Sequence, residues 1–460
     1  MKDFPVTAEQ FYASRDDRTN RCGVDSGYQR TKCVVYLAPL AALTAAGQTM
    51  LLASCNLLSR WCRDVTIIMP TVRTSAELDE DVSDLGDFIL SQMRDADPFG
   101  TFRVAETASD EAAISLYVGY QSHDEIKASG IFINASGWLA AIDTRPINLP
   151  EGNDRNYLGA IAAACLGVAQ MFKCAIGMQQ GNYIRSGVFD VFRLNWADDV
   201  AQTSWPDNLA IGNLLMVGAG SVGSSAAYCM RLAGIVGTIT IVDRDIVKVE
   251  NFNRSPIFGR RSYGDSKAQA VADFLAHSKL NASFEVSWWD DFLNAHPRAT
   301  FDFDIWFPLA NEFGVRRAMQ ANVPPLMIHA STTANWGVNH GRHIPGRDDC
   351  LVDRFRTEVQ PSDLTCATVS TSTSSGQDID AALPFASLFA GLLITADLVR
   401  LQLDGYPQLP NFALFDWYSP IDRIQAWDHV AREGCICQEQ GVGFHDKFNA
   451  GTRYRHLSSF

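Results

Sequence analysis

Residues 213–247 have the sequence NLLMVGAGSVGSSAAYCMRLAGIVGTITIVDRDIV, the most regular pattern in the chain. The apolar run Leu214–Val217 is followed by closely spaced glycines and by a helical segment rich in small residues that ends near Gly234. A second apolar run, Thr238–Val242, ends on Asp243. This pattern predicts a strand, a glycine turn, a helix and a second strand that carries an acid at its end.

The glycines at 218, 220 and 223 indicate what this unit binds. Gly218, Gly220 and Gly223 allow a tight turn and let the backbone approach a phosphate at the N-terminus of the helix, where free N–H groups favour an anion. Asp243 can accept hydrogen bonds from ribose hydroxyls. The stretch therefore predicts a Rossmann-type nucleotide-binding unit.

The rest of the C-terminal half continues as alternating strands and helices. We expect strands at Ser283–Trp288, Asp304–Leu309 and Pro325–Ala330, an apolar helix at Leu383–Leu401, and a hairpin formed by Phe412–Tyr418 and Arg423–Asp428. Such alternation predicts an α/β fold with a mostly parallel sheet covered on both faces.

The N-terminal half repeats this plan without the nucleotide-binding residues. When residues 34–43 are aligned without a gap to residues 214–223, the positions of the three glycines are occupied by Ala38, Leu40 and Leu43. Met69 takes the place of the strand-end acid. Weaker similarities follow in the same order, although any two α/β domains share such patterns. We interpret the chain as a tandem pseudo-duplicate whose first copy is inactive.

The predicted organisation follows from this duplication. It comprises an inactive domain over residues 1–200, a linker over 201–211, an active domain over 212–440 with a cysteine-bearing loop near 350–382, and a tail over 441–460. The two copies would form an internal pseudo-dimer, and the sequence also allows a homodimer.

Composition excludes several classes of protein. Hydrophobic residues make up 47% of the 460 residues, so the chain can bury a large core. Its formal net charge of −14 argues against nucleic acid as a partner. The longest apolar stretches are broken by polar residues, so we expect no membrane span. The eleven scattered cysteines are typical of reduced thiols, and we expect a cytoplasmic protein.

Two further motifs follow the nucleotide-binding unit. An Asn-x-x-Arg motif, Asn251 to Arg254, begins eight residues after Asp243, and Lys267 lies thirteen residues beyond Arg254 in a Gly-x-x-Lys-Ala element. With the glycine turn, this set resembles the ThiF-type adenylating family, which includes ubiquitin-activating enzymes and enzymes that activate sulfur carriers. The similarity covers about residues 212–440, and the tandem plan resembles the inactive and active halves of ubiquitin-activating enzymes.

The resemblance implies a reaction with ATP and Mg²⁺. In this family the C-terminal carboxylate of a small β-grasp, ubiquitin-like protein attacks the α-phosphorus of ATP. Arg254 and Lys267 would stabilise the negative charge that grows as pyrophosphate leaves. Relatives also supply an arginine from an N-terminal helix to the phosphates, and Arg15, Arg18 and Arg21 are the candidates here.

The metal sites depart from the family pattern. The Mg²⁺-binding aspartate of the family aligns with Asn311, a neutral and weaker ligand that is followed by Glu312. Glu312 could replace the aspartate, or the metal could depend on the ATP phosphates. Relatives often bind structural zinc with two cysteine pairs, and Cys350, Cys435 and Cys437 occupy similar places. The alternative is a vestigial zinc site.

Cys366 corresponds to the catalytic cysteine of the resemblance. It lies in the Ser- and Thr-rich stretch DLTCATVSTSTSSGQDID, ahead of the apolar helix that begins at Leu383. A thiolate at this place could take the acyl group from the adenylate as a thioester and pass it to a conjugating enzyme. The alternative is an incidental loop cysteine.

The leading hypothesis is therefore an activating enzyme that adenylates and then thioesterifies a ubiquitin-like protein. Three alternatives stay open at this point. The first is adenylation without a thioester, on a sulfur carrier or a small substrate. The second is a nucleotide-binding scaffold that has lost catalysis. The third is a nicotinamide oxidoreductase, which the Asn-x-x-Arg and lysine motifs disfavour.

Overall fold

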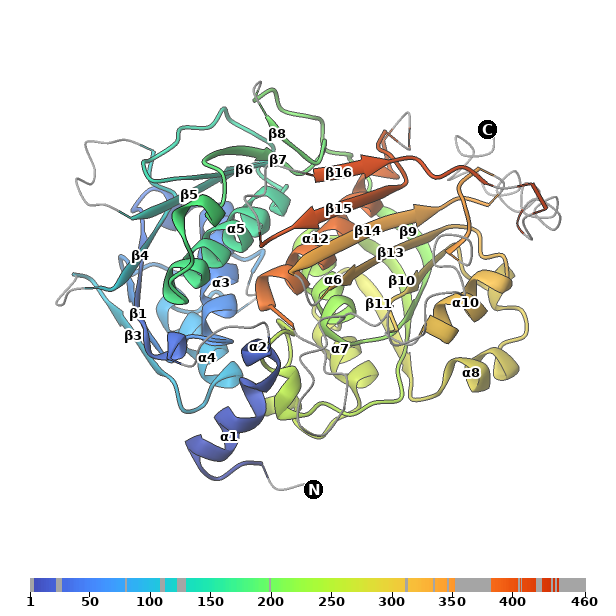
Figure 1. The fold of residues 1–460 in the computed structure, drawn as a ribbon, viewed down its shortest axis with the longest axis horizontal. Helices are drawn as coiled ribbons and strands as arrows, with labels where there is room; N and C mark the ends of the chain where they lie inside the picture. The colour runs from blue at the N-terminus through green and yellow to red at the C-terminus, as the bar shows by residue number, and fades with distance from the viewer. Residues whose placement is uncertain are drawn as a thin grey trace.

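The strand, turn, helix and strand predicted at residues 213–247 are present as β9 (Ala210–Val217), α6 (Ser221–Leu232) and β10 (Val236–Val242). The computed structural model describes residues 4–21, 27–78, 81–107, 112–121, 130–197, 200–310, 313–333, 336–345, 347–351, 382–403, 406, 408–418, 424–431, 433–434 and 437. Figure 1 shows two sheets at the outer sides of the molecule with helices between them.

The described strands form two eight-stranded sheets with the same strand order. In the N-terminal half the order is β3 (Thr101–Ala105), β2 (Asp64–Ile68), β1 (Lys32–Leu37), β4 (Ile114–Val118), β5 (Ile131–Ser136), β6 (Leu139–Asp143), β7 (Gly187–Asp190) and β8 (Asn195–Ala197). In the C-terminal half it is β11 (Leu280–Glu285), β10, β9, β12 (Ile305–Pro308), β13 (Met327–Thr332), β14 (Gly337–His343), β15 (Phe412–Asp416) and β16 (Ile424–Trp427).

Strand directions also match between the halves. In each sheet the first five strands in this order are parallel and the last three are antiparallel. Because parallel neighbours need crossover connections, the helices that make them cover the sheet. The predicted α/β fold and two-half architecture are therefore confirmed.

Helices of the two halves pack against each other in the centre of the molecule. The N-terminal half contributes α1 (Ala8–Arg15), α2 (Asp17–Asn20), α3 (Ala45–Ser59), α4 (Leu85–Ala96) and α5 (Leu158–Ala175). The C-terminal half contributes α6, α7 (Lys267–Leu275) and α12 (Pro384–Arg400), and it also contains α8 (Trp289–Ala295), α9 (Ala299–Asp302) and α10 (Phe313–Ala321). Helix α12 contacts both α6 and α5, and one continuous apolar core extends through both halves (Figure 1).

A second, smaller core covers the outer face of the C-terminal sheet. Trp289 and Phe292 of α8 and Met319 of α10 pack there against strand residues such as Trp306. In the N-terminal half, the described residues that connect β3, β4 and β5 include no helix. The prediction of a sheet covered on both faces therefore holds for the C-terminal half.

The gap-free alignment of the two glycine turns is wrong beyond the first strand. Six residues separate β1 from Thr44, the N-cap of α3, whereas two separate β9 from Gly220, the N-cap of α6. The structural counterpart of Gly223 is therefore Gly47, not Leu43. A Cβ at either glycine would lie 2.2 Å from a carbonyl oxygen of the preceding turn.

The alignment of Met69 with Asp243 agrees with the structure. The amide of Met69 donates to Ala105 O at 3.1 Å, and the amide of Asp243 donates to Glu285 O at 3.2 Å. Ala105 and Glu285 are the last residues of equivalent strands, β3 and β11. Met69 therefore stands where the ribose-binding acid would be.

Other sequence-based boundaries need smaller corrections. β11 ends at Glu285, three residues before the predicted end, because Trp288 caps α8 and Trp289 begins it. β14 was not predicted, since its sequence GVNHGRH is polar and contains two glycines although most of it is buried. Residues 200–209 are irregular and β9 begins at Ala210, while the predicted domain boundaries stay a prediction.

Helix α5 is apolar for a structural reason. It is long and apolar enough to span a membrane, with a mean hydropathy of 1.6, but 89% of it is buried inside the protein. It packs on α3, α12 and the N-terminal sheet. Its composition is that of a core helix.

Candidate nucleotide-binding site

A pocket of about 380 Å³ lies at the carboxyl ends of β9, β10 and β12. Most of the nucleotide-site residues predicted from the sequence line this pocket, namely Gly218, Gly220, Asp243, Asn251, Arg254 and Lys267. Gly223 does not line it. Ligands of open α/β sheets bind at the carboxyl ends of the strands, at the point where the strand order reverses, which here lies between β9 and β12. The structure therefore brings the predicted motifs together in one pocket.

The glycine turn is shaped for close backbone approach. Gly218 has φ +104°, and a Cβ there would lie 2.4 Å from Ala310 N. Gly223 packs α6 against the turn, while a Cβ at Gly220 would meet nothing within 4 Å. Because Gly220 is the N-cap of α6 and has no side chain to cap it, the helix N-terminus is available for an anion.

Asp243 is half-buried and held by backbone donors. Its carboxylate accepts from Ala219 N at 2.7 Å and from Asp245 N at 2.8 Å. Burial raises its pKa, although the charge of Lys267 and the two backbone hydrogen bonds act to lower it. The carboxylate at the end of β10 is thus fixed beside the glycine turn, as ribose binding requires.

Asp245 holds Lys267 at the pocket through its backbone and its side chain. Lys267 N donates to Asp245 O at 2.8 Å, and Lys267 Nζ lies 2.7 Å from Asp245 Oδ2. Burial alone would raise the pKa of Asp245, but its hydrogen bond and ion pair with Lys267 lower it. Lys267 is the first residue of α7.

The Asn-x-x-Arg motif forms a rigid turn on the pocket wall. Asn251 Oδ1 accepts from Lys248 N at 2.9 Å. Arg254 Nη1 donates to Glu250 O at 2.5 Å and to Asn253 Oδ1 at 3.0 Å. Both Asn251 and Arg254 line the pocket.

The structure separates the three N-terminal arginines, and Arg21, which does not line the pocket, pairs with Asp17 at 2.8 Å. Arg18, in α2, lines the pocket. Arg15 does not line it, because its completely buried guanidinium pairs with Asp16 at 2.6 Å and Asp97 at 2.5 Å and also donates to Ser59 O. Arg15 is therefore a core ion-pair residue rather than a phosphate ligand, which corrects the expectation for it.

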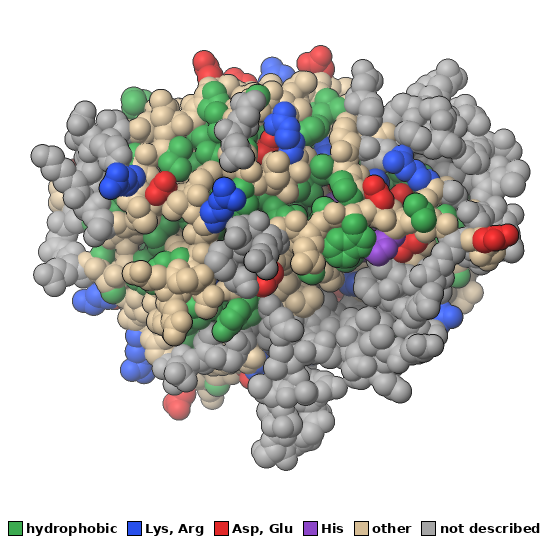
Figure 2. Space-filling model, turned by 45° about the horizontal axis from the view of Figure 1, so that its top comes forward, with side chains coloured by type: hydrophobic (Ala, Val, Ile, Leu, Met, Phe, Trp, Pro, Cys, Tyr) green, Lys and Arg blue, Asp and Glu red, His purple; other side chains and the backbone are tan. Residues whose placement is uncertain are grey.

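Charge in the pocket is opposite to that of the chain. Three acidic residues line it, Asp243, Asp245 and Glu250, against six basic ones, Arg18, Arg244, Lys248, Arg254, Lys267 and Arg316. The face shown in Figure 2 carries scattered basic and acidic side chains among hydrophobic ones. A basic pocket in a chain of net charge −14 fits an anionic ligand such as a nucleoside triphosphate.

The sequence analysis assigned no role to the lining side chains of Arg316, Trp288 and Arg244. Arg316 Nε donates to Ala310 O at 2.9 Å, next to the glycine turn. Trp288 is 48% exposed, and the Arg244 guanidinium lies 3.0 Å from its ring centroid. Trp288 follows β11 and Arg316 follows β12. Because the carboxyl ends of these strands lie at the pocket, their places after the strands could have indicated both residues.

Some predicted residues lie outside the described part of the chain. These are Asn311 and Glu312 of the magnesium site, Cys366, and Cys435. Ala310 directly precedes Asn311, and Ala382 directly follows the segment 352–381 that contains Cys366. Both Ala310 and Ala382 line the pocket. Ala382 N donates to Arg18 O at 3.3 Å, so Ala382 is held at the pocket beside α2.

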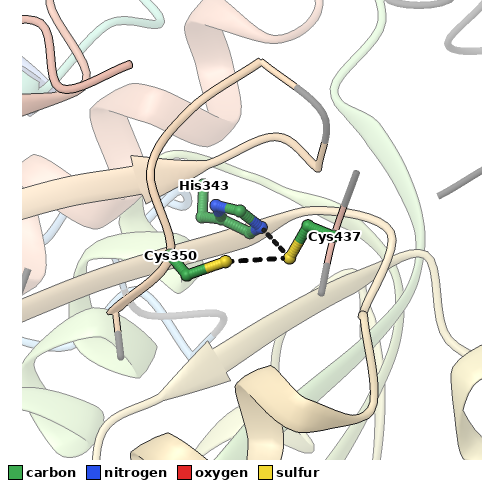
Figure 3. Close-up of side chains that lie close together, drawn as sticks. All are labelled: His343, Cys350 and Cys437. Carbon is green, nitrogen blue, oxygen red and sulfur yellow. Dashed lines mark hydrogen bonds between the residues drawn. The ribbon is translucent and has the colours of Figure 1, made fainter. Parts of the chain in front are cut away.

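A second group of side chains fits a metal ion. Figure 3 shows His343, from β14, pointing toward Cys350 and Cys437. The two Sγ atoms are 3.0 Å apart, and Cys437 Sγ lies 3.3 Å from His343 Nε2. All three residues are buried, and their ligand atoms lie within 4.8 Å of one another.

The surroundings of this group favour a zinc site. His343 Nδ1 lies 2.9 Å from Asp349 O, which fixes the ring with Nε2 toward the sulfurs. Two cysteines and one histidine are a typical zinc donor set, and a fourth ligand completes a tetrahedral site. The sequence analysis proposed Cys350 and Cys437 but missed His343, which lies outside any cysteine motif.

The N-terminal half does not preserve the nucleotide-binding turn. Thr44 Oγ1 accepts from Gly47 N at 3.1 Å and so caps α3 itself. Leu40 and Leu43 stand on the exposed turn, at 69% and 73% exposure. A capped helix and an apolar turn remove the anion site that Gly220 leaves open in the C-terminal half.

Comparison with known families agrees with this division. Residues 204–425 match the ThiF family, and residues 32–186 match the BilD N-terminal domain. Residues 204–425 thus form a ThiF-family domain, which confirms the resemblance that the motifs of the C-terminal half predicted.

Individual relatives cover smaller parts. The uncharacterized Sinorhizobium fredii protein y4jF is 24% identical over 228 residues, 49% of this chain and 43% of that protein. The probable adenylyltransferase/sulfurtransferase MoeZ of Mycobacterium tuberculosis is 43% identical over 62 residues, 14% of this chain and 16% of that protein. The adenylyltransferase and sulfurtransferase MOCS3 of Caenorhabditis briggsae is 32% identical over 93 residues, 20% and 21% of the two chains. The chain thus spans less than half the length of these relatives.

Among solved structures, Escherichia coli MccB with MccA-N7isoASN aligns with 49% of this chain and 67% of that chain. The sequence identity is 17% and the TM-score is 0.40.

Proposed function

We propose that this protein is an ATP-dependent activating enzyme that adenylates the C-terminal carboxylate of a small ubiquitin-like protein. It would then transfer the acyl group to Cys366 as a thioester and pass it to a conjugating enzyme. The ThiF-family match over residues 204–425 supports the adenylating chemistry. We place the reaction in the cytoplasm, where the eight described cysteines, none of which forms a disulfide, would remain reduced.

One observation carries the proposal, which is the order of groups along three neighbouring strand ends. The uncapped N-terminus of α6 lies at the end of β9, Asp243 at the end of β10, and Trp288 just beyond the end of β11. Phosphates, ribose and base of one nucleotide follow the same order. This order supports the binding of a whole nucleotide such as ATP rather than of an isolated anion.

The basic side chains fit nucleotidyl transfer. The substrate carboxylate oxygen forms a bond to the α-phosphorus, the bond from that phosphorus to the bridging oxygen breaks, and pyrophosphate leaves with the electron pair. Arg254, Lys267 and Arg18 line the pocket where they can stabilise this leaving charge. When bound, Mg²⁺ supplies further charge neutralisation at the phosphates, and Asn311 and Glu312 are its predicted ligands.

The thioester step is the finer part of the proposal. The Cys366 thiolate would attack the acyl carbon of the adenylate, the bond from that carbon to the phosphate oxygen would break, and AMP would leave. Support comes from Ala382, which follows the undescribed segment 352–381 and lies in the pocket wall. Adenylation alone, with transfer to another acceptor, is the competing function.

ATP–pyrophosphate exchange tests the adenylation step. Labelled pyrophosphate should enter ATP only when a purified β-grasp protein with an intact C-terminus is added. The same protein without its C-terminal residues serves as control. An enzyme that binds ATP tightly yet shows no exchange with any intact carrier would favour the nucleotide-binding scaffold.

Cys366→Ala separates the two steps. We expect this variant to keep carrier-dependent exchange and to lose a conjugate that a reducing agent cleaves, whereas Cys174→Ala should keep both. Wild-type enzyme that exchanges pyrophosphate without any such conjugate would favour adenylation alone. A conjugate formed by Cys366→Ala would contradict the assignment of this cysteine.

A further inference from the structure

The segment 249–262, which carries the Asn-x-x-Arg motif, packs on the N-terminal half of the chain. Phe252 lies against the ring of Phe11 in α1, with centroids 6.1 Å apart. Asn253 Nδ2 donates to Thr19 Oγ1 at 3.1 Å, and Arg261 N donates to Asp95 Oδ1 at 2.9 Å. These contacts come from three helices of the half that has lost the nucleotide-binding turn.

Arg60, at the end of α3, makes the most extensive of these contacts. Its guanidinium donates to Phe252 O, Pro256 O and Phe258 O, each at 2.7 Å. Three backbone carbonyls spread over seven residues are thereby tied to one rigid group. Arg254 of the motif lies between the first two of them.

Asn56, one turn earlier on α3, orients this guanidinium. Asn56 Oδ1 accepts from Arg60 Nε at 3.1 Å, and Asn56 Nδ2 donates to Pro256 O at 2.8 Å. Arg60 is 3% exposed, and burial lowers its pKa to about 9 although the charge of Asp95 raises it in part. A buried cation stabilises a fold only if its hydrogen bonds are well made, so the three carbonyls must keep this geometry.

We infer that Arg60 is a positioning residue for the nucleotide-binding site. By holding the carbonyls of Phe252, Pro256 and Phe258, it fixes the turn that presents Asn251 and Arg254 to the pocket. The half without a nucleotide site thus acts as the template for the motif of the other half. This inference rests on the proposed function only in taking Asn251 and Arg254 as nucleotide ligands.

A matched pair of buried arginines tests this inference. Arg400 also joins the halves, since its guanidinium donates to Val191 O at 2.6 Å and Phe192 O at 3.0 Å, but neither Arg400 nor these residues line the pocket. Arg60→Met and Arg400→Met therefore remove similar cross-half contacts, and only the first touches the motif turn. Arg60→Lys and Asn56→Ala are milder variants in case Arg60→Met does not fold.

Two readouts are compared in the full-length protein. In hydrogen–deuterium exchange, peptides covering 249–262 should exchange faster in Arg60→Met and Asn56→Ala, and at the wild-type rate in Arg400→Met. In calorimetry with Mg·ATP, Arg60→Met should raise Kd about tenfold, whereas Arg400→Met should raise it less than about twofold even if its Tm falls as much. Arg60→Lys should recover part of the slow exchange at 249–262 and part of the affinity for Mg·ATP.

The outcomes separate this inference from the proposed function. Unchanged exchange at 249–262 in Arg60→Met would overturn the inference, and so would equal losses of ATP affinity in the Arg60 and Arg400 variants. Wild-type protein that does not bind ATP would contradict the proposed function instead. The exchange of 249–262 would still decide whether Arg60 holds the turn.

Discussion

Asp243 has two tasks at the residue scale, because it accepts hydrogen bonds from Ala219 N and Asp245 N and would also accept them from ribose. Asp243→Ala removes a charged acceptor, which costs roughly 1.5–3 kcal/mol. We therefore expect the Kd of Mg·ATP to rise about 10- to 150-fold by calorimetry. Asp243→Asn keeps the shape and one acceptor, so its Kd for Mg·ATP should lie between those of the wild type and Asp243→Ala. Wild-type affinity in Asp243→Ala would contradict ribose binding at this strand end.

Trp288 offers a flat apolar surface at the base end of the pocket. Stacking of a base on an aromatic side chain contributes about 1–3 kcal/mol, so Trp288→Ala should weaken Mg·ATP binding about 5- to 150-fold. Binding should also quench the tryptophan fluorescence of the wild type. Trp427→Ala is the control, because Trp427 is exposed on β16 and does not line the pocket. Equal affinities in the two variants would remove Trp288 from the site.

At the element scale, α1 and α2 lie close together but present their arginines to different environments. Arg18→Ala should weaken binding of Mg·ATP more than binding of AMP and leave Tm near the wild-type value. Arg15→Ala removes the cation paired with the buried carboxylate of Asp97, while Asp16 keeps its ion pair with Arg63, and it should cost about 3–5 kcal/mol of unfolding free energy. Denaturant titration and nucleotide calorimetry on both variants measure these effects. A large stability loss in Arg18→Ala with unchanged ATP affinity would reverse the assignment.

The His343, Cys350 and Cys437 group links β14 to two distant segments, and a bound metal would hold them together. We expect about one zinc per chain by elemental analysis. Zinc at 100 times its Kd would add about 2.7 kcal/mol to stability, so a strong chelator should lower Tm. Cys350→Ser should lose the metal and show no further response to chelator, while Cys174→Ser should behave as wild type. Metal-free protein with the wild-type Tm would argue for a vestigial site.

Elements differ in how well the sequence predicts them. Long apolar runs and the glycine turn were predictable because their periodicity reflects local geometry, as α12 and β9 show. The four extra residues before Thr44 were not predictable, since no local pattern distinguishes an insertion from a replaced glycine. The histidine of the metal group was not predictable either. His343 meets Cys350 and Cys437 only because β14 passes beside both, and that depends on tertiary packing.

At the scale of the whole molecule, each half has its own sheet, but the two halves share one apolar core. Phe172 of α5 packs against Phe385 of α12, with ring centroids 5.8 Å apart, and Phe189 packs against Phe415 across the same boundary, at 6.5 Å. Arg60 and Arg400 add buried hydrogen bonds in opposite directions across it. The equivalent sheets thus behave as one structure in which only one half has kept a nucleotide site.

This arrangement predicts one ATP per chain and one unfolding transition. Calorimetry should give a stoichiometry of about one, because Thr44 caps the helix that would bind phosphate in the N-terminal half and Met69 replaces its acid. Thermal unfolding should coincide when followed by circular dichroism and by tryptophan fluorescence, since exposing either half would expose the shared core. Saturating Mg·ATP should raise the single Tm for both probes together. Two binding sites per chain would contradict the loss of the first site, and two transitions, only one of them shifted by ATP, would contradict the shared core.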